Sequence, residues 1–393
     1  MNNIVPDLKL NHLFFLLFIF ICLVNFESFS QNLNIHNTTK SIADEKRKHG
    51  SSEDSTRAST KGSIMPVPFI ITDMNLGFGG ILALPYIHPQ KHSKRKNTPP
   101  TITGIAGGAT STKSWAVAGL HSESFKNDKV RYMGGALVAS VNLDFYNIGR
   151  FDISDRPINV NIKGWGLLQS AMFRIKDSNF FIGGQYRFLD ATSSINLNDP
   201  DHPLLDSLIN QIHFQTYVSG IALKASFDNR ENALSPKKGI NGGFTLNYNP
   251  TWLGASQNFV TADVFFKAYV PFTRWLYSIY HFDGEFSGGD IPFYMKPYVA
   301  LRGAPVMRYS ANNAMLAEIQ LRGYFYRNFA LVAFTGAGKA FDSFSEFKSS
   351  EWIINYGTGF RWEIEKIFGI RTGLDFAWAN GEFGWYVVIG TAI

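Results

Sequence analysis

The residues best suited to chemistry lie between 298 and 322, where an irregular stretch leads into a strand. The irregular part holds Leu301, Arg302 and Gly303. From residue 315 onward side chains alternate strictly, with one face formed by Leu316, Glu318, Gln320 and Arg322 and the other by Met315, Ala317, Ile319 and Leu321. An apolar face opposite a charged face is typical of a barrel wall with a wet interior. The Arg-Gly pair therefore predicts a loop folded back into that interior, with a surface turn as the simpler alternative.

A second group of reactive side chains surrounds His121. It follows Gly119-Leu120 and precedes Ser122, Glu123 and Ser124, a composition that could supply a Ser-His-acid triad. The polar end of a strand explains the same residues more simply. The sequence holds no HExxH motif, Cys/His cluster or phosphate loop, and 198–202 lacks calcium-loop spacing. We therefore expect no enzyme activity, no metal and no cofactor.

Composition favours a chain of many strands. The 393 residues include 35 glycines, 15% aromatic and only 17% charged residues. No internal stretch approaches the ~18 consecutive apolar residues of a membrane-spanning helix. High glycine and aromatic content without such runs is typical of all-β proteins, outer-membrane barrels among them.

The N-terminus predicts export. Lys9 and His12 precede an apolar segment at 13–26, and Ser28 and Ser30 supply small residues before a cleavage site, which together predict a signal peptide over 1–30. The only cysteine, Cys22, lies inside it, so the mature chain has no thiol or disulfide. The destination is the envelope of a two-membrane bacterium, and the net charge of +6 is better explained by solvated or lipid-facing basic groups than by a nucleic-acid partner.

The rest of the chain divides in two. Residues 31–64 are polar and predict a disordered periplasmic linker. From 65 to 393 strands and turns alternate, and fifteen strands are expected at 75–87, 101–110, 114–124, 130–146, 157–174, 178–189, 212–226, 239–250, 257–271, 274–287, 313–326, 328–340, 351–364, 367–379 and 383–393. A closed antiparallel barrel of this kind needs an even number of strands, so we predict sixteen. A soluble β-sandwich also alternates, but the signal peptide, strand lengths near ten residues and aromatic strand ends favour the transmembrane barrel.

The connections differ in length. Residues 125–129 and 271–274 predict tight turns. Longer loops, expected on the outer side, are 89–100, 196–211, 288–312 and 342–350. A helical turn could lie at 206–211.

Short motifs recur in a family order along the predicted barrel. They are Asn75–Gly80 (NLGFGG), 145–149 (FYNIG), Asp228-Asn229-Arg230 with 234–239 (LSPKKG), Leu301-Arg302-Gly303, 357–361 (GTGFR) and 373–375 (GLD). In this order and spacing, residues 66–393 resemble the bacterial surface antigen barrel of the BamA/TamA-like outer-membrane superfamily. Within the hairpin motif, Asp228 can pair with Arg230, Pro236 presets φ and Gly239 admits positive φ, so these residues are expected to be architectural.

The resemblance also implies a role for Arg302. In the superfamily the loop arginine enters the lumen and pairs with an acid on a neighbouring strand, which suits a guanidinium in a confined polar interior. Gly303 would allow a sharp turn beside it. The aspartate of the family pattern is replaced by Gly336 in this chain. Inward-facing Glu318, Glu363 and Asp375 are the candidate partners, with Glu363 or Asp375 favoured, and a loop not pinned to any acid is the alternative.

The expected function is non-enzymatic. Superfamily members that assemble or secrete proteins carry periplasmic POTRA domains before the barrel, and 31–64 is too short for one. The favoured function is still a role in inserting or translocating proteins or lipids at the outer membrane, with membrane lipid and periplasmic or outer-membrane proteins as partners. A porin-like barrel plugged by the 288–312 loop is the first alternative, and an outer-membrane lipid hydrolase is the second.

Overall fold

The computed structural model describes residues 62–64, 66–89, 101–148, 151–152, 157–196, 213–231, 236–326, 329–365 and 370–389. The expected signal peptide, nearly all of the expected linker and the helical turn at 206–211 lie outside these ranges. None of the helices in the described part of the chain is long and apolar enough to cross a membrane.

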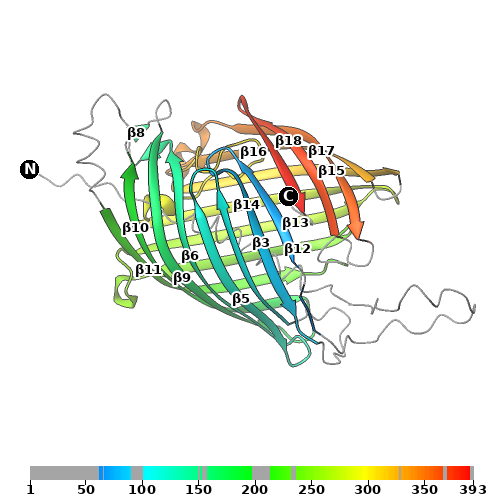
Figure 1. Cartoon of the computed structure of the whole chain (residues 1–393), viewed down its shortest axis with the longest axis horizontal. Coiled ribbons are helices and arrows are strands. Elements are labelled where there is room, and N and C mark those ends of the chain that lie inside the picture. The colour runs from blue at the N-terminus through cyan, green and yellow to red at the C-terminus, as the bar shows by residue number, and fades with distance from the viewer. Residues whose placement is uncertain are drawn as a thin grey trace, which may run out of the picture.

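Antiparallel strands curve into the wall of a barrel (Figure 1). The bounds are β1 Ser63–Ile64, β2 Val67–Asp73, β3 Gly77–Ile87, β4 Ile102–Thr110, β5 Trp115–Phe125, β6 Val130–Phe145, β7 Asn147–Ile148, β8 Phe151–Asp152, β9 Ile158–Arg174, β10 Phe180–Asn196, β11 His213–Asp228, β12 Gly239–Asn249, β13 Phe259–Pro271, β14 Leu276–Gly289, β15 Asn313–Tyr326, β16 Phe329–Phe341, β17 Ile353–Glu365, β18 Ile370–Ala379 and β19 Glu382–Ile389. Three short 3-10 helices are η1 Thr251–Leu253, η2 Phe293–Met295 and η3 Phe344–Lys348.

Sixteen of these strands, β2 to β6 and β9 to β19, form the wall, and β1 adds a two-residue pairing to β3. The all-β prediction and the number sixteen agree with this wall. The strand absent from the fifteen expected ranges is β2, which carries Pro68 and follows Pro66, and prolines normally argue against a strand. Strands β7 and β8 pair only with each other.

The wall is not closed, and in this respect the predicted closed barrel is wrong. Each neighbouring pair of wall strands from β2 round to β19 shares a register of paired residues. Strands β19 and β2 lie side by side, but the described residues of the two strands share no such register, although the Thr72 hydroxyl donates to the Trp385 carbonyl oxygen over 2.6 Å. The β2 edge is short, and Pro68 has no N–H to donate, so it offers little to a continuous ladder. We call this β19/β2 boundary the seam.

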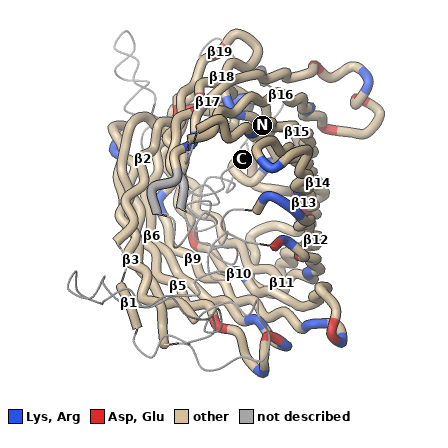
Figure 2. Tube along the Cα trace, turned by 90° about the vertical axis from the view of Figure 1, so that its right-hand side faces the viewer, with Lys and Arg blue, Asp and Glu red and all other residues tan. Residues whose placement is uncertain are grey.

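The two faces of the wall follow the expected alternation on the β13–β18 side. In β15 Leu316, Glu318, Gln320 and Arg322 are buried on the inner face. Large apolar side chains such as Ile105, Leu223 and Trp362 are exposed on the outer face. In Figure 2 the charged positions of the wall concentrate along β12 to β16, while the wall of β2 to β5 is mostly tan.

The opposite half of the interior is apolar, so the prediction of a wet interior holds only in part. A buried cluster includes Leu137, Val141 and Leu143 of β6 and Val160 and Ile162 of β9. The same cluster contains Ile291, Phe293, Tyr294, Met295, Val306 and Met307 of the β14–β15 connection. That connection therefore fills part of the barrel with a hydrophobic core.

The tight turns and longer loops predicted from the sequence separate by end with one exception, although the short turns at 74–76, 111–114 and 380–381 share the end of the longer loops. The turns after β5, β9 and β13 lie at one end, and the connections 197–212, 290–312 and 342–352 leave the wall at the other end, because consecutive strands are antiparallel. The connection 88–101 follows β3 and therefore leaves at the end of the short turns. Its expected place among the outer loops is wrong, since length alone does not decide the end from which a loop leaves.

Candidate functional site

The β14–β15 connection runs inside the barrel and carries the Arg-Gly pair. It contains η2 and an isolated bridge between Tyr298 and Ser310. Val299, Leu301 and Ala304 are buried on either side of Arg302. Burial raises the pKa of the Tyr298 phenol well above its ordinary value, and nearby Glu285 and Asp73 add to the shift. Tyr298 is therefore neutral at every ordinary pH.

Arg302 reaches the inner wall on three strands. Its guanidinium contacts both oxygens of Glu318 on β15, with Nε 3.3 Å from Oε2. Its Nη1 donates to Asp375 Oδ2 on β18 at 2.8 Å and to Gln320 Oε1 at 3.0 Å. The guanidinium carbon lies 3.4 Å from the centroid of the Phe334 ring on β16. The planar fork is held by two carboxylates and an aromatic face, an arrangement that a lysine could not reproduce.

A second layer of side chains fixes the two carboxylates. Arg361 donates to Asp375 through Nη1 at 2.5 Å and Nη2 at 2.8 Å. The Asn355 amide donates to Glu318 Oε2 at 2.8 Å and to the Arg302 carbonyl oxygen at 3.1 Å. The arginine contact is therefore part of a buried network that spans β15 to β18.

Gly303 allows the loop to lie directly on β18. Its φ is +93°, and a Cβ there would approach the Trp378 carbonyl carbon to 2.8 Å. Its N–H donates to the Tyr386 hydroxyl of β19 at 2.9 Å. Only glycine satisfies both the positive φ and this close approach.

The structure explains the missing aspartate at Gly336. Gly336 of β16 is the register partner of Glu318. A Cβ at Gly336 would lie 2.6 Å from the Ala317 carbonyl oxygen and 2.9 Å from Asn355 Oδ1. The acid that faces Arg302 thus sits on the neighbouring strand, and Asn355 occupies the adjacent space.

Two of the three expected partners of Arg302 can be assessed in the structure. Both Glu318 and Asp375 contact it. Glu363 lies in β17 opposite Arg371, but its side chain is outside the described part of the structure. Sequence reasoning did not single out Gln320, Phe334, Asn355, Arg361 and Tyr386 as contacts of this loop. The alternation of β15 and β17 marks Gln320, Asn355 and Arg361 as inward-facing, but it does not show which loop residue they meet.

The hairpin residues lie together at the end of the short turns. Arg230 donates to Asp228 through Nε at 2.9 Å and Nη2 at 2.8 Å. Pro236 is buried. Gly239 has φ +114°, and a Cβ there would lie 2.6 Å from Arg230 Cα. These contacts fix the described residues at the two ends of this connection.

The serine triad is not assembled around His121. On β5, Ser122 and Ser124 point to the face opposite His121, and the Ser124 hydroxyl donates to Asp128 at 2.8 Å. His121 Nδ1 lies 2.8 Å from the Thr103 hydroxyl, and its Nε2 is 3.5 Å from Glu123. Among the described residues no group of three or more His, Cys, Asp or Glu side chains could hold a metal ion.

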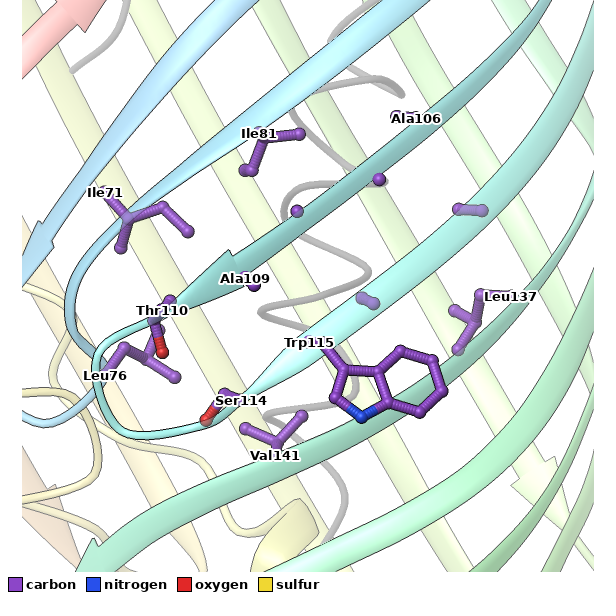
Figure 3. A pocket seen from close by; sticks show the side chains of 14 residues that line it. Ile71, Leu76, Ile81, Ala106, Ala109, Thr110, Ser114, Trp115, Leu137 and Val141 are labelled. Atoms are coloured by element: carbon purple, nitrogen blue, oxygen red, sulfur yellow. The ribbon is translucent and has the colours of Figure 1, made fainter.

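A small apolar pocket lies on the inner wall of β2 to β6 (Figure 3). Ile71, Ile81, Ala106, Leu137 and Val141 line it. The pocket begins at β2, the first strand of the wall, and so lies next to the seam. The inner wall is therefore apolar on the β2 side of the seam and charged on the β19 side.

These features define an antiparallel barrel whose internal loop is held to the wall by an arginine. No protein-family model and no curated protein sequence matches the chain.

Solved structures do match. BamA from Haemophilus ducreyi lacking POTRA domains 1–3 has a TM-score of 0.57 at 13% identity, over 85% of this chain and 70% of that one. CdiB from Acinetobacter baumannii has a TM-score of 0.58 at 8% identity, over 84% and 60% of the two chains. CdiB from Escherichia coli has a TM-score of 0.55 at 10% identity, over 83% and 62%. The chain thus spans between 60% and 70% of the length of these structures, and its fold is that of the BamA and CdiB barrels.

Proposed function

We propose that this protein is an integral barrel of the bacterial outer membrane that acts in inserting or translocating proteins or lipids. The BamA-like and CdiB-like fold supports the membrane assignment, as do the exposed apolar side chains of the outer face. Membrane lipid, and periplasmic or outer-membrane proteins, are the partners that this function requires. The observation that carries the proposal is the seam.

The seam is where the wall opens at the lowest cost. Separating any other two neighbouring wall strands breaks a ladder, such as the one that pairs Phe181–Asn196 of β10 with β9. Breaking a ladder in a membrane leaves backbone groups without partners, at several kcal/mol for each group. Among the described residues no such ladder joins β19 to β2, so a lateral opening there requires less free energy than at any other pair of wall strands.

The β14–β15 connection at 290–312, which carries Arg302 and is called the arginine loop below, is placed to control this opening. Gly303 rests on β18 and donates to Tyr386 of β19, and Arg302 binds Asp375 of β18. These contacts hold the last two strands of the wall, β18 and β19, to the arginine loop. Release of the arginine loop would free the β19 edge, so loop release and opening of the seam are coupled.

A disulfide across the seam tests the proposal. Thr72 and Trp385 face outward on adjoining strands, so a Thr72→Cys, Trp385→Cys double variant can be oxidised in cells. Oxidation is expected to reproduce the effect of depleting the protein, a fall in the level of other outer-membrane proteins or lipids, and reduction is expected to reverse it.

The matched control is Leu321→Cys with Ala333→Cys, outward-facing register partners on paired strands. Oxidising this pair should change nothing, because these strands are already joined. If depletion of the protein leaves all other outer-membrane proteins and lipids at normal levels, the proposed function is wrong.

A plugged porin is the second candidate, favoured by the buried β14–β15 connection. Its test is conductance in a planar bilayer before and after deletion of 304–312. A plugged pore predicts a clear rise, and a barrel silent in both forms excludes it. The hydrolase alternative is not proposed, since its serines face away from His121.

A further inference from the structure

The inner wall around the arginine loop carries more positive than negative charge. Arg302, Arg322 and Arg361 face only Glu318 and Asp375 in this network. Arg302 contacts both oxygens of Glu318, and Arg361 contacts both oxygens of Asp375. The two carboxylates are therefore fully engaged without Arg322.

Arg322 is a buried cation without a carboxylate. Its side chain is 1% exposed, and its Nε and Nη2 have no hydrogen-bond partner in the described chain. Its register partners on the inner face are Tyr277 and Val332. The Arg322 side chain is hydrogen-bonded to Tyr277, and its guanidinium carbon lies 5.7 Å from the Tyr277 ring centroid. One neutral partner offsets only part of the cost of burying a charge.

Two further donors nearby are also unsatisfied. Gln320 Nε2 and Arg361 Nε have no partner within the described residues, and both side chains are 0% exposed. The Oε1 of Gln320 accepts from Arg302, which fixes Nε2 as the free end of the amide. Buried N–H groups normally find acceptors, and this patch of wall has four unpaired donors against one unpaired acceptor, Asn355 Oδ1, so the donors are in excess.

We propose that Arg322, Arg361 and Gln320 form a binding site for a phosphate group, supplied by the headgroup of a membrane lipid or by free phosphate. Arginine has five donors and no acceptor, so its unsatisfied nitrogens require an anion. A tetrahedral phosphate presents several oxygens to a fork of N–H groups and can bind a guanidinium through two of them.

The surroundings favour a lipid as the source. Only β18 and β19 separate Arg361 from the seam, and the apolar pocket of β2 to β6 lies on the other side (Figure 3). A phospholipid at the seam would place its headgroup on the charged wall and its acyl chains on the apolar wall. This choice of source rests on the proposed function, because a lipid reaches the site only through an opening seam.

The phosphate site itself is tested by thermal unfolding of the full chain in a phosphate-free detergent, with and without inorganic phosphate. Wild type is expected to gain about 3 °C or more at saturating phosphate. Arg322→Gln should lose this gain and be no less stable than wild type without phosphate, because it removes an unpaired buried charge. The control Lys267→Gln, another inward-facing cation, should keep the gain.

The opposite pattern would overturn the site. If Arg322 is only a structural residue held by Tyr277, Arg322→Gln will lower the unfolding temperature and phosphate will affect neither protein. Because the donors are enclosed, samples should be incubated with phosphate before heating.

The lipid source is tested by native mass spectrometry of the barrel extracted from membranes and reconstituted with a phospholipid or with a neutral glycolipid. Retention of phospholipid by wild type, reduced tenfold or more in Arg322→Gln, supports the lipid. If free phosphate stabilises the protein but no phospholipid is retained, the lipid is excluded as the source and the site binds the free phosphate ion. If phosphate does not stabilise the protein but the seam disulfide still blocks its function, the phosphate site is excluded and the proposed function is retained.

Discussion

At the scale of single residues, the arginine contact decides where the internal loop lies. Arg302 is the one loop side chain that binds Glu318 and Asp375, and these acids come from strands separated by two others. A charge taken into the barrel is stable only with such partners. The contact therefore converts an irregular segment into a fixed part of the wall.

The first prediction concerns Arg302 itself. Arg302→Gln leaves Glu318 without its cation and is expected to lower stability by about 3–5 kcal/mol, the cost of breaking a buried ion pair. Arg302→Lys should recover only part of this loss, since an ammonium group cannot bind two carboxylates and a ring face at once. Denaturant unfolding in detergent and proteolysis of the 290–312 connection measure both effects. Equal stability of the three proteins would show that the contact does not hold the loop.

The second prediction restores the aspartate of the family pattern. In Gly336→Asp the new Cβ meets the Ala317 carbonyl oxygen at 2.6 Å, and the new carboxylate lies beside Glu318. We expect a loss of about 1–3 kcal/mol from steric overlap and repulsion. Adding Glu318→Gln should recover the repulsive part only, as measured by the same unfolding assay. If Gly336→Asp is more stable than wild type, close packing does not require glycine at this position.

At the scale of elements, the β11–β12 hairpin depends on one glycine. In Gly239→Ala the unfavourable φ of +114° combines with an approach of 2.6 Å to Arg230 Cα, so the bidentate Asp228–Arg230 pair must shift. We expect poor assembly into the membrane or a loss of about 2 kcal/mol or more. Heat-modifiable migration on a gel reports the folded fraction.

Gly254→Ala is the matched control for this third prediction. Gly254 also has a positive φ, +95°, but a Cβ there would meet nothing within 4 Å. Its loss should be limited to the backbone strain of about 1 kcal/mol. Equal effects at the two positions would exclude the close approach to Arg230 as the cause.

At the scale of the whole molecule, the interior has two halves of different chemistry. The half formed by β3 to β10 packs hydrophobically against residues on both sides of Arg302 in the β14–β15 connection, and the half formed by β12 to β18 binds Arg302 itself through charges. The connection is therefore held in two independent ways. Opening of the lumen requires both to be released.

The fourth prediction tests the apolar half. Phe145 is 1% exposed and meets Phe293 edge to face at 4.7 Å between ring centroids. Phe145→Ala is expected to cost about 3–5 kcal/mol and to make 290–299 accessible to protease. Phe265→Ala is the control, because Phe265 also faces the lumen but remains 36% exposed. Matching losses at both positions would show that no hydrophobic core fills the barrel.

The sequence alone determined the wall. Alternation in segments such as 257–271 and 313–326 predicts strands because successive side chains must face opposite solvents, a rule that acts locally. The requirement for an even strand number likewise predicted a sixteenth strand, and this strand is β2, whose Pro68 argues against a strand in the sequence. The candidate acids near Arg302 could be found in the same way, since parity shows that Glu318 and Asp375 point inward.

Only the tertiary structure decided what these side chains meet. Alternation gives the direction of a side chain but not its partner, so Glu318 and Asp375 could not be joined to Arg302 without the register of the four strands β15 to β18. The apolar half of the lumen and the missing ladder at the seam depend on contacts between segments far apart in the chain. Such contacts arise when the sheet curves round on itself, and no local pattern records how its first and last strands will meet.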